Sequence, residues 1–246
     1  MKNRWVYPLF NFLLVLALPL IGAVILLRWR RRVFSNGKNR WAERWGYLPA
    51  EALACLSRQT RQTSGEAPPS VWRASGEGGV WWVHAVSLGE VKAIETFLHQ
   101  IPASSGAKVL LSAVTPEALA WATDNKVADV IIAAPLDFPW VVRRAFHAVR
   151  PAVFVSVESE FWPNLLREAK RSGARVALIN GRISERSFKS YRRIRPLLAA
   201  LWEQVDLYAV RQAGDAQRFA ALGVPVDKIH VTGNLKYCLN IIIPAA

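Results

Sequence analysis

Cysteine is scarce in this chain, with two residues among 246. Cys55 and Cys238 lie far apart in the sequence and belong to no CxxC pair or Cys/His cluster. This pattern excludes a disulfide scaffold and argues against a structural zinc site. It fits a protein of a reducing compartment.

Acidic side chains are also few, 18 against 32 basic ones, which gives a formal net charge of +14. The excess is uneven, because residues 1–46 hold nine basic groups and one acid, Glu43. A nucleic-acid-binding protein would spread its basic footprint over the folded domain. The distribution therefore argues against a nucleic-acid partner. Low hydrophobicity, the mark of disorder, is absent too, since 52% of the residues are hydrophobic.

No charged residue occurs between Val6 and Leu27, a run dominated by Leu, Val, Ile, Phe and Ala. A helix needs about 20 apolar residues to cross the hydrocarbon core of a membrane. More Lys and Arg follow the run than precede it, which predicts a single-pass anchor with the rest of the chain in the cytoplasm. A secretory signal peptide is a weaker interpretation, because arginines stand where a cleavage site should be. Pro8 and Pro19 leave a hairpin or shallow insertion as a third interpretation.

Short apolar runs alternate with amphipathic stretches from Val80 onward, after an aromatic and basic segment (33–56) and a loop without apolar period (57–79). Continuous apolar strands between helices are typical of a parallel sheet covered on both faces. We therefore predict an α/β fold, a Rossmann-like doubly wound parallel sheet with an N-terminal transmembrane helix. The expected strands are 80–86, 108–114, 129–134, 152–157, 175–180, 206–210 and 228–232.

Neither of two common nucleotide-binding motifs is present. No GxGxxG follows the first expected strand, and GxxxxGK[ST] occurs nowhere. A dinucleotide-dependent oxidoreductase and a P-loop nucleotidase are both disfavoured. The loops at the carboxyl ends of the strands are where such a sheet binds its ligands.

The loop after the first expected strand contains Ser87, Gly89 and Glu90. Ser-x-x-Glu fits a capping box at a helix start, which would explain both polar residues structurally. A carboxylate at the carboxyl edge of the sheet can instead act as a general base towards a bound hydroxyl group. Gly89 would allow a substrate to approach closely.

Two further loops carry charged residues. Glu158 and Glu160 follow the fourth expected strand and precede Phe161 and Trp162; matching of the helix dipole is the structural alternative for the two acids. After the next strand, the stretch 182–195 holds six basic groups and one acid, beginning at Arg182. It fits either a solvated helix face or an anion site for phosphates.

Taken in order, the blocks WWVHAVSLGEV, LSAVTPEALA, PLDFPWVVRRAFHAVRPAVFVSVESEFWPNLL, LINGRISERSFKSYRR and VTGNLKY resemble one family. They look like the amino-terminal half of the 3-deoxy-D-manno-octulosonic acid (Kdo) transferases of lipopolysaccharide synthesis. The anchor and the stretch RWAERWGYLP match the layout of that family as well.

The resemblance implies the amino-terminal domain of a GT-B glycosyltransferase at the inner membrane. Such enzymes transfer Kdo from CMP-Kdo to the lipid A precursor, a phosphorylated, acylated glucosamine disaccharide. The transfer inverts the anomeric centre, and no cofactor or bound metal is implied. The family's base falls on Glu90, and acceptor binding falls on Ser87, Gly89, Glu158, Glu160 and Arg182.

The expected organisation is an anchor (1–32), a membrane-proximal segment and linker (33–79), a Rossmann-like acceptor-binding domain (80–236) and the start of an interdomain linker (237–246). CMP-Kdo is expected to bind mainly a carboxyl-terminal domain that this sequence lacks. We therefore expect the chain alone to be inactive or feeble. A membrane-tethered lipid A-binding module without catalysis is the alternative function.

Overall fold

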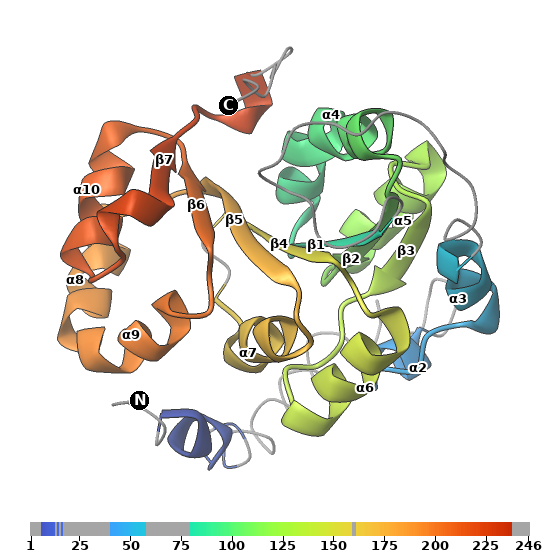
Figure 1. Ribbon diagram of the computed structural model, residues 1–246, viewed down its shortest axis with the longest axis horizontal. Coiled ribbons are helices and arrows are strands. Elements are labelled where there is room, and N and C mark those ends of the chain that lie inside the picture. Colours follow the sequence, from blue (N-terminus) through green and yellow to red (C-terminus); the bar gives the residue numbers. More distant parts are fainter. Residues whose placement is uncertain are drawn as a thin grey trace.

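The computed structural model describes residues 6–12, 14, 16, 40–57, 79–158 and 161–237. In these residues, seven parallel strands form one sheet with helices on both faces (Figure 1). Every expected strand is present within one residue of its predicted ends, which confirms the parallel, Rossmann-like α/β fold. The strands are β1 (Val80–Ala85), β2 (Lys108–Ala113), β3 (Val130–Ala133), β4 (Val153–Val157), β5 (Arg175–Gly181), β6 (Leu207–Val210) and β7 (Ile229–Val231).

The strand order is β3-β2-β1-β4-β5-β6-β7. The chain first builds outward from β1 to β3, then returns to the other side of β1 and continues from β4 to β7. The direction of building therefore reverses between β1 and β4. In open α/β sheets, ligands bind in the crevice outside the carboxyl ends of the strands at this switch point.

Helices cover the two faces of the sheet unequally (Figure 1). One face carries α4 and α5, and the other carries α6, α7 and α9, while α8 and α10 lie at the end of the sheet formed by β6 and β7. The bounds are α4 (Leu88–Ser105), α5 (Pro116–Asn125), α6 (Pro139–Val149), α7 (Pro163–Arg171), α8 (Glu185–Arg193), α9 (Arg195–Trp202) and α10 (Ala213–Ala221), with short 3-10 helices η1 (Val226–Lys228) and η2 (Leu235–Tyr237).

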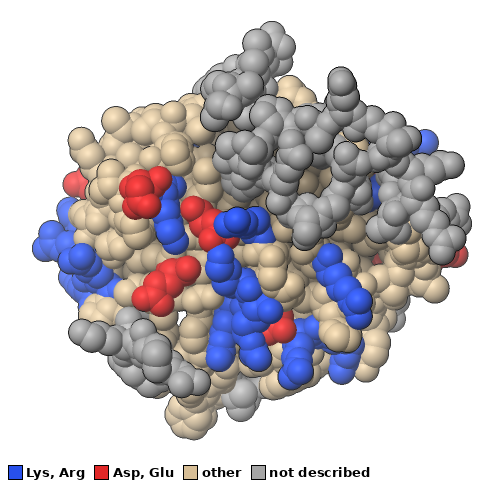
Figure 2. Space-filling view, viewed as in Figure 1, with Lys and Arg blue, Asp and Glu red and all other residues tan. Residues whose placement is uncertain are grey.

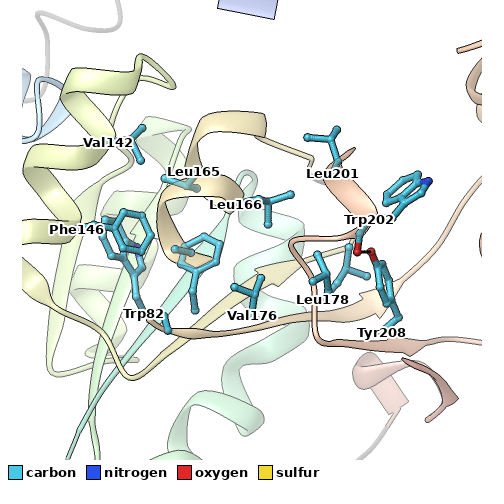
Figure 3. Packing of buried hydrophobic residues seen from close by; sticks show 14 of the residues in the cluster. Trp82, Val142, Phe146, Leu165, Leu166, Val176, Leu178, Leu201, Trp202 and Tyr208 are labelled. Atoms are coloured by element: carbon cyan, nitrogen blue, oxygen red, sulfur yellow. Dashed lines mark hydrogen bonds between the residues drawn. The ribbon is translucent and has the colours of Figure 1, made fainter. Parts of the chain in front are cut away.

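The larger core lies between the sheet and helices α6, α7 and α9 (Figure 3). Trp82 stacks on Phe146 with ring centroids 4.5 Å apart and meets Phe154 edge-on at 5.9 Å. Towards the other end, Trp202 meets Tyr208 edge-on at 6.3 Å. Such aromatic pairs add about 0.5–1.5 kcal/mol beyond the area that they bury. Strands apolar on both faces are what produced the continuous hydrophobic runs in the sequence.

Asp137, in the loop after β3, holds the start of α7. Its carboxylate accepts hydrogen bonds from the backbone N–H groups of Asn164 (3.1 Å) and Leu165 (2.7 Å). Asn164 Nδ2 donates back to the Asp137 carbonyl oxygen at 2.6 Å. Burial raises the pKa of Asp137 to about 7, although both backbone hydrogen bonds act to lower it. The contact fixes the helix that follows the loop after β4.

Residues 40–57 form α2 (Trp41–Arg44) and α3 (Ala50–Ser57), and α2 is bound to the carboxyl ends of β2 and β3. Glu43 Oε2 accepts from the Ala133 N–H at 2.5 Å, and Arg44 donates to the carbonyl oxygens of Val114 and Ala134. Burial lowers the pKa of Arg44 to about 10. This part of the predicted membrane-proximal segment thus packs directly on the sheet. The predicted domain boundary at residue 80 stays a prediction.

Most of the predicted anchor (6–27) lies outside the described residues. Residues 6–12 are helical, and the Tyr7 hydroxyl donates to the Ala200 carbonyl oxygen at 3.1 Å. Among the residues that the structure describes, no helix has the length and apolar character that a membrane crossing requires. The predicted linker starting at residue 237 also lies almost wholly outside the described chain.

Candidate functional site

The loops after β1 and β4 lie side by side at the switch point of the sheet. His84 of β1 is in register with Ser156 of β4, so the two strands reach their carboxyl ends together. The first loop brings Ser87, Gly89 and Glu90, and the second brings Glu158. Neighbouring strands are separated by about 4.8 Å, so these two loops leave the sheet next to each other.

Glu90 closes the turn from β1 into α4. Its Oε2 accepts from the Val86 N–H at 2.7 Å, and its Oε1 accepts from the Ser87 hydroxyl at 3.0 Å. The Glu90 N–H in turn donates to Ser87 Oγ at 3.4 Å. The capping-box geometry is therefore present, and Glu90 is buried (8% exposed). These hydrogen bonds hold the Glu90 carboxylate in one orientation at the start of α4.

Gly89 is exposed on the first turn of α4, directly before Glu90. A Cβ built on it would meet one neighbouring atom within 4 Å, Ser87 Oγ at 3.9 Å. Packing in the described chain therefore does not require glycine here. The predicted role in letting a substrate approach Glu90 stays a prediction.

Glu158 follows β4 in a left-handed conformation (φ +60°) and forms an ion pair with Arg211, which follows β6. Asn180, near the end of β5, is also left-handed (φ +56°) and fully buried. Arg211 Nε donates to Asn180 Oδ1 at 3.0 Å. These contacts form a cluster of Glu158, Asn180 and Arg211 across three adjacent strand ends.

Arg182 follows β5 and is exposed, and Glu160 lies outside the described residues. The basic stretch after Arg182 forms α8, which has no buried residue. Figure 2 shows Lys and Arg gathered over the middle of the face turned to the viewer, with a few acids among them. Of the predicted site residues, the structure thus places Ser87, Gly89, Glu90 and Glu158 at the switch point and Arg182 one strand farther along.

His84 is buried near the carboxyl end of β1, next to the loop that contains Glu90. Its Nδ1 lies 3.0 Å from Ser112 Oγ, which also accepts from the Trp82 indole N–H at 2.8 Å. Burial, with Arg44 nearby, lowers the pKa of His84 to about 3, so the ring is neutral. His84 also meets Trp162 edge-on at 5.7 Å, which links the end of β1 to the loop after β4.

Asn180, Arg211 and His84 were not among the predicted site residues. The available signal was position alone, since each stands at or near the carboxyl end of an expected strand. No group of three or more His, Cys, Asp or Glu side chains suited to holding a metal ion is found within the described ranges.

Comparison with known proteins decides the family. A model of the 3-deoxy-D-manno-octulosonic acid transferases (Kdo transferases) matches residues 39–239. The chain belongs to this family. The match spans both switch-point loops and the cluster of Glu158, Asn180 and Arg211, so the resemblance drawn from the sequence blocks is confirmed.

Two relatives show how much of the length of a Kdo transferase this chain covers. The chain is 33% identical to the 3-deoxy-D-manno-octulosonic acid transferase of Chlamydia pneumoniae over 167 residues, which is 65% of this chain and 38% of that protein. It is 30% identical to a probable mitochondrial 3-deoxy-D-manno-octulosonic acid transferase of Arabidopsis thaliana over 240 residues, 96% of this chain and 48% of that protein. The chain therefore spans less than half the length of these relatives.

Among solved structures, the chain is similar to the UDP-GlcNAc 2-epimerase of Neisseria meningitidis bound to UDP-GlcNAc. The sequence identity is 13% and the TM-score is 0.47, over 64% of this chain and 47% of that one.

Proposed function

We propose that this Kdo transferase chain provides the acceptor side of Kdo transfer from CMP-Kdo to the lipid A precursor, with Glu90 as the general base. The observation that carries the proposal is the placement of a buried, pre-oriented carboxylate at the switch point of a sheet of this family. In the proposed reaction, an acceptor hydroxyl oxygen attacks the anomeric carbon of Kdo while the bond to the phosphate of CMP breaks. Glu90 takes the hydroxyl proton, and CMP leaves.

The reaction is proposed to invert the anomeric centre in a single displacement, without a metal ion. Ser87, Gly89, Glu158, Glu160 and Arg182 are proposed to bind the acceptor. Hydroxyl groups of the glucosamine disaccharide suit the carboxylates, and its phosphates suit Arg182. CMP-Kdo is proposed to bind mainly to parts of the enzyme outside this chain.

An exposed aromatic patch supports a lipid-bound acceptor. Trp45, Tyr47 and Trp140 are 43%, 56% and 53% exposed. Phe138 stacks between Trp45 and Trp140, with centroid distances of 6.4 and 5.1 Å, and the Arg144 guanidinium lies 4.0 Å from the Tyr47 ring centroid. Exposed Trp and Tyr beside arginines are typical of surfaces at the membrane interface. We propose that this patch, together with the anchor, places the site at the cytoplasmic side of the inner membrane.

The test is a transfer assay in membranes with CMP-Kdo and lipid A precursor, on the unaltered chain and on Glu90→Gln. Binding of the precursor is measured in parallel. Transfer that disappears in Glu90→Gln while binding persists supports the proposal. Binding without transfer, even when the remainder of a family member is added in trans, favours the acceptor-binding module. The expectation that the 246 residues alone turn over little or no substrate is tested by the same assay.

A further inference from the structure

Arg211 connects the ends of three neighbouring strands. Its backbone N–H donates to the Gly181 carbonyl oxygen of β5 at 3.0 Å. Its Nε donates to Asn180 Oδ1 at 3.0 Å and to the Asn180 carbonyl oxygen at 3.3 Å, and its terminal nitrogen binds Oε1 of Glu158 after β4. The guanidinium of Arg211, directly after β6, thus contacts the side chain of Glu158, directly after β4.

Both partners of Arg211 have unusual backbone conformations. Asn180 and Glu158 are left-handed, with φ of +56° and +60°. Asn adopts this region readily, whereas Glu does so only at an energetic cost. Such strain persists when surrounding contacts over-determine it, and it gathers at functional sites. The ion pair to Arg211 and the hydrogen bond from the Glu158 N–H to the Ile179 carbonyl oxygen (2.8 Å) are the contacts that hold Glu158 here.

The ion pair between Arg211 and Glu158 is largely shielded from solvent, more so at Arg211 than at Glu158. The side chain of Arg211 is 13% exposed and that of Glu158 is 27% exposed. Arg211 binds Oε1, and no residue of the described chain donates a hydrogen bond to Oε2. The carboxylate of Glu158 therefore binds Arg211 through one oxygen and can accept a hydrogen bond from a ligand with the other. This oxygen belongs to the loop that faces the Glu90 loop across the switch point.

The same cluster reaches the last block of the family's sequence pattern. Asn180 Oδ1, which accepts from Arg211, also accepts from the Leu235 N–H at 3.2 Å. Leu235 begins η2, which packs against α4, the helix that Glu90 opens. Asn180 Oδ1 therefore links the Arg211–Glu158 pair to the segment that packs against α4.

We infer that Arg211 is a positioning residue, which holds Glu158 so that its Oε2 accepts a hydrogen bond from a sugar hydroxyl of the acceptor. The inference rests on the proposed function, because it takes the phosphorylated glucosamine disaccharide as the ligand. The inference adds Arg211, which was not among the residues proposed to bind the acceptor.

The test is a double-mutant cycle on acceptor affinity. The full chain in detergent is titrated with the phosphorylated glucosamine disaccharide of the lipid A precursor, without its acyl chains. Glu158→Gln, Arg211→Gln and the double variant are compared with the unaltered chain, and Arg171→Gln serves as the matched control. Arg171 loses the same charge but lies at the far end of α7, with its side chain 57% exposed. Unfolding temperatures of all variants show that each is folded.

We expect each single variant to bind roughly tenfold more weakly, as loss of a hydrogen bond to a charged group would give. The double variant should bind no more weakly than either single one, because Arg211 acts through Glu158. Losses that multiply to roughly a hundredfold, or full affinity in Arg211→Gln, overturn the inference. If Arg211→Gln unfolds, Arg211→Lys replaces it, since lysine keeps the charge but not the forked contact. An unaltered chain that binds no disaccharide overturns the proposed function itself, and this outcome is distinct from the two above.

Discussion

The carboxylate of Glu90 lies 2.7 Å from the backbone nitrogen of Val86 and caps the turn that leads from β1 into α4. This contact gives one side chain two separable properties. As a cap, Glu90 stabilises the helix start; as a carboxylate at the switch point, it is the proposed general base. The two roles respond differently to an isosteric substitution.

Glu90→Gln should preserve the cap and remove the base. The amide oxygen can accept from the Val86 N–H, and the Ser87 hydroxyl can accept from the amide nitrogen where it now donates to Glu90. We expect the free energy of unfolding to change by less than about 1 kcal/mol. Transfer in a complete enzyme should fall by at least about 100-fold. Denaturant unfolding and the membrane transfer assay measure the two effects.

Glu117→Gln is the matched control, because Glu117 is an exposed acid in the first turn of the neighbouring helix α5. It should leave transfer unchanged. Transfer that survives in Glu90→Gln would show that Glu90 is a capping residue and that another group accepts the proton.

The fold was predictable because a strand that is buried on both faces of the sheet has apolar residues at consecutive positions. Trp82 and Val83 point to opposite faces of the sheet and are both fully buried, so β1 is apolar at consecutive positions. The positions of the loops at the carboxyl ends follow from the strands. The order of the strands in the sheet cannot be predicted in this way, because it depends on which strand edges pair in space.

The site was predictable only where its residues are close in sequence. Ser87 and Glu90 form a local motif, and their hydrogen bonds were expected from their spacing. Arg211 and Glu158 are 53 positions apart, and the left-handed turn that brings Glu158 to Arg211 has no signal in a residue type that usually avoids it. Contacts of this kind require the sheet to be assembled first.

Gly46 is where the chain leaving α2 passes against α6. It has φ +79°, and a Cβ built there would lie 2.4 Å from the Val141 carbonyl oxygen. Gly46→Ala should therefore lower the free energy of unfolding by about 3 kcal/mol or more, through backbone strain and a clash with backbone that cannot move freely. Denaturant unfolding measures this change.

Gly106→Ala is the comparison that separates the cost of backbone strain from the cost of a steric clash. Gly106 also has a positive φ (+65°), but a Cβ built on it meets no atom of the described residues within 4 Å, its chain neighbours aside. Gly106→Ala should cost only about 1 kcal/mol. Equal losses in the free energy of unfolding for the two substitutions would mean that the chain after α2 can move away from α6 without destabilising the fold.

Asp137 should make stability depend on pH in an unusual direction. In the folded chain burial raises the pKa of Asp137 from 3.8 to about 7. Its contribution is fully present below about pH 4, where folded and unfolded chains both hold the proton. Between about pH 4 and 7 the unfolded chain releases the proton first, so stability falls as pH rises, by roughly 4 kcal/mol at most. Above pH 7 the contribution is constant and no further loss occurs.

Asp137→Asn removes this titration, because the amide stays neutral at every pH. The unfolding free energy of the unaltered chain minus that of Asp137→Asn should therefore decline between pH 4.5 and 7.5. Asp124→Asn, which alters an exposed acid near the end of α5, should leave the pH dependence as it is. Parallel curves for the unaltered chain and Asp137→Asn would mean that the two backbone N–H groups of α7 stabilise the carboxylate enough to cancel the effect of burial.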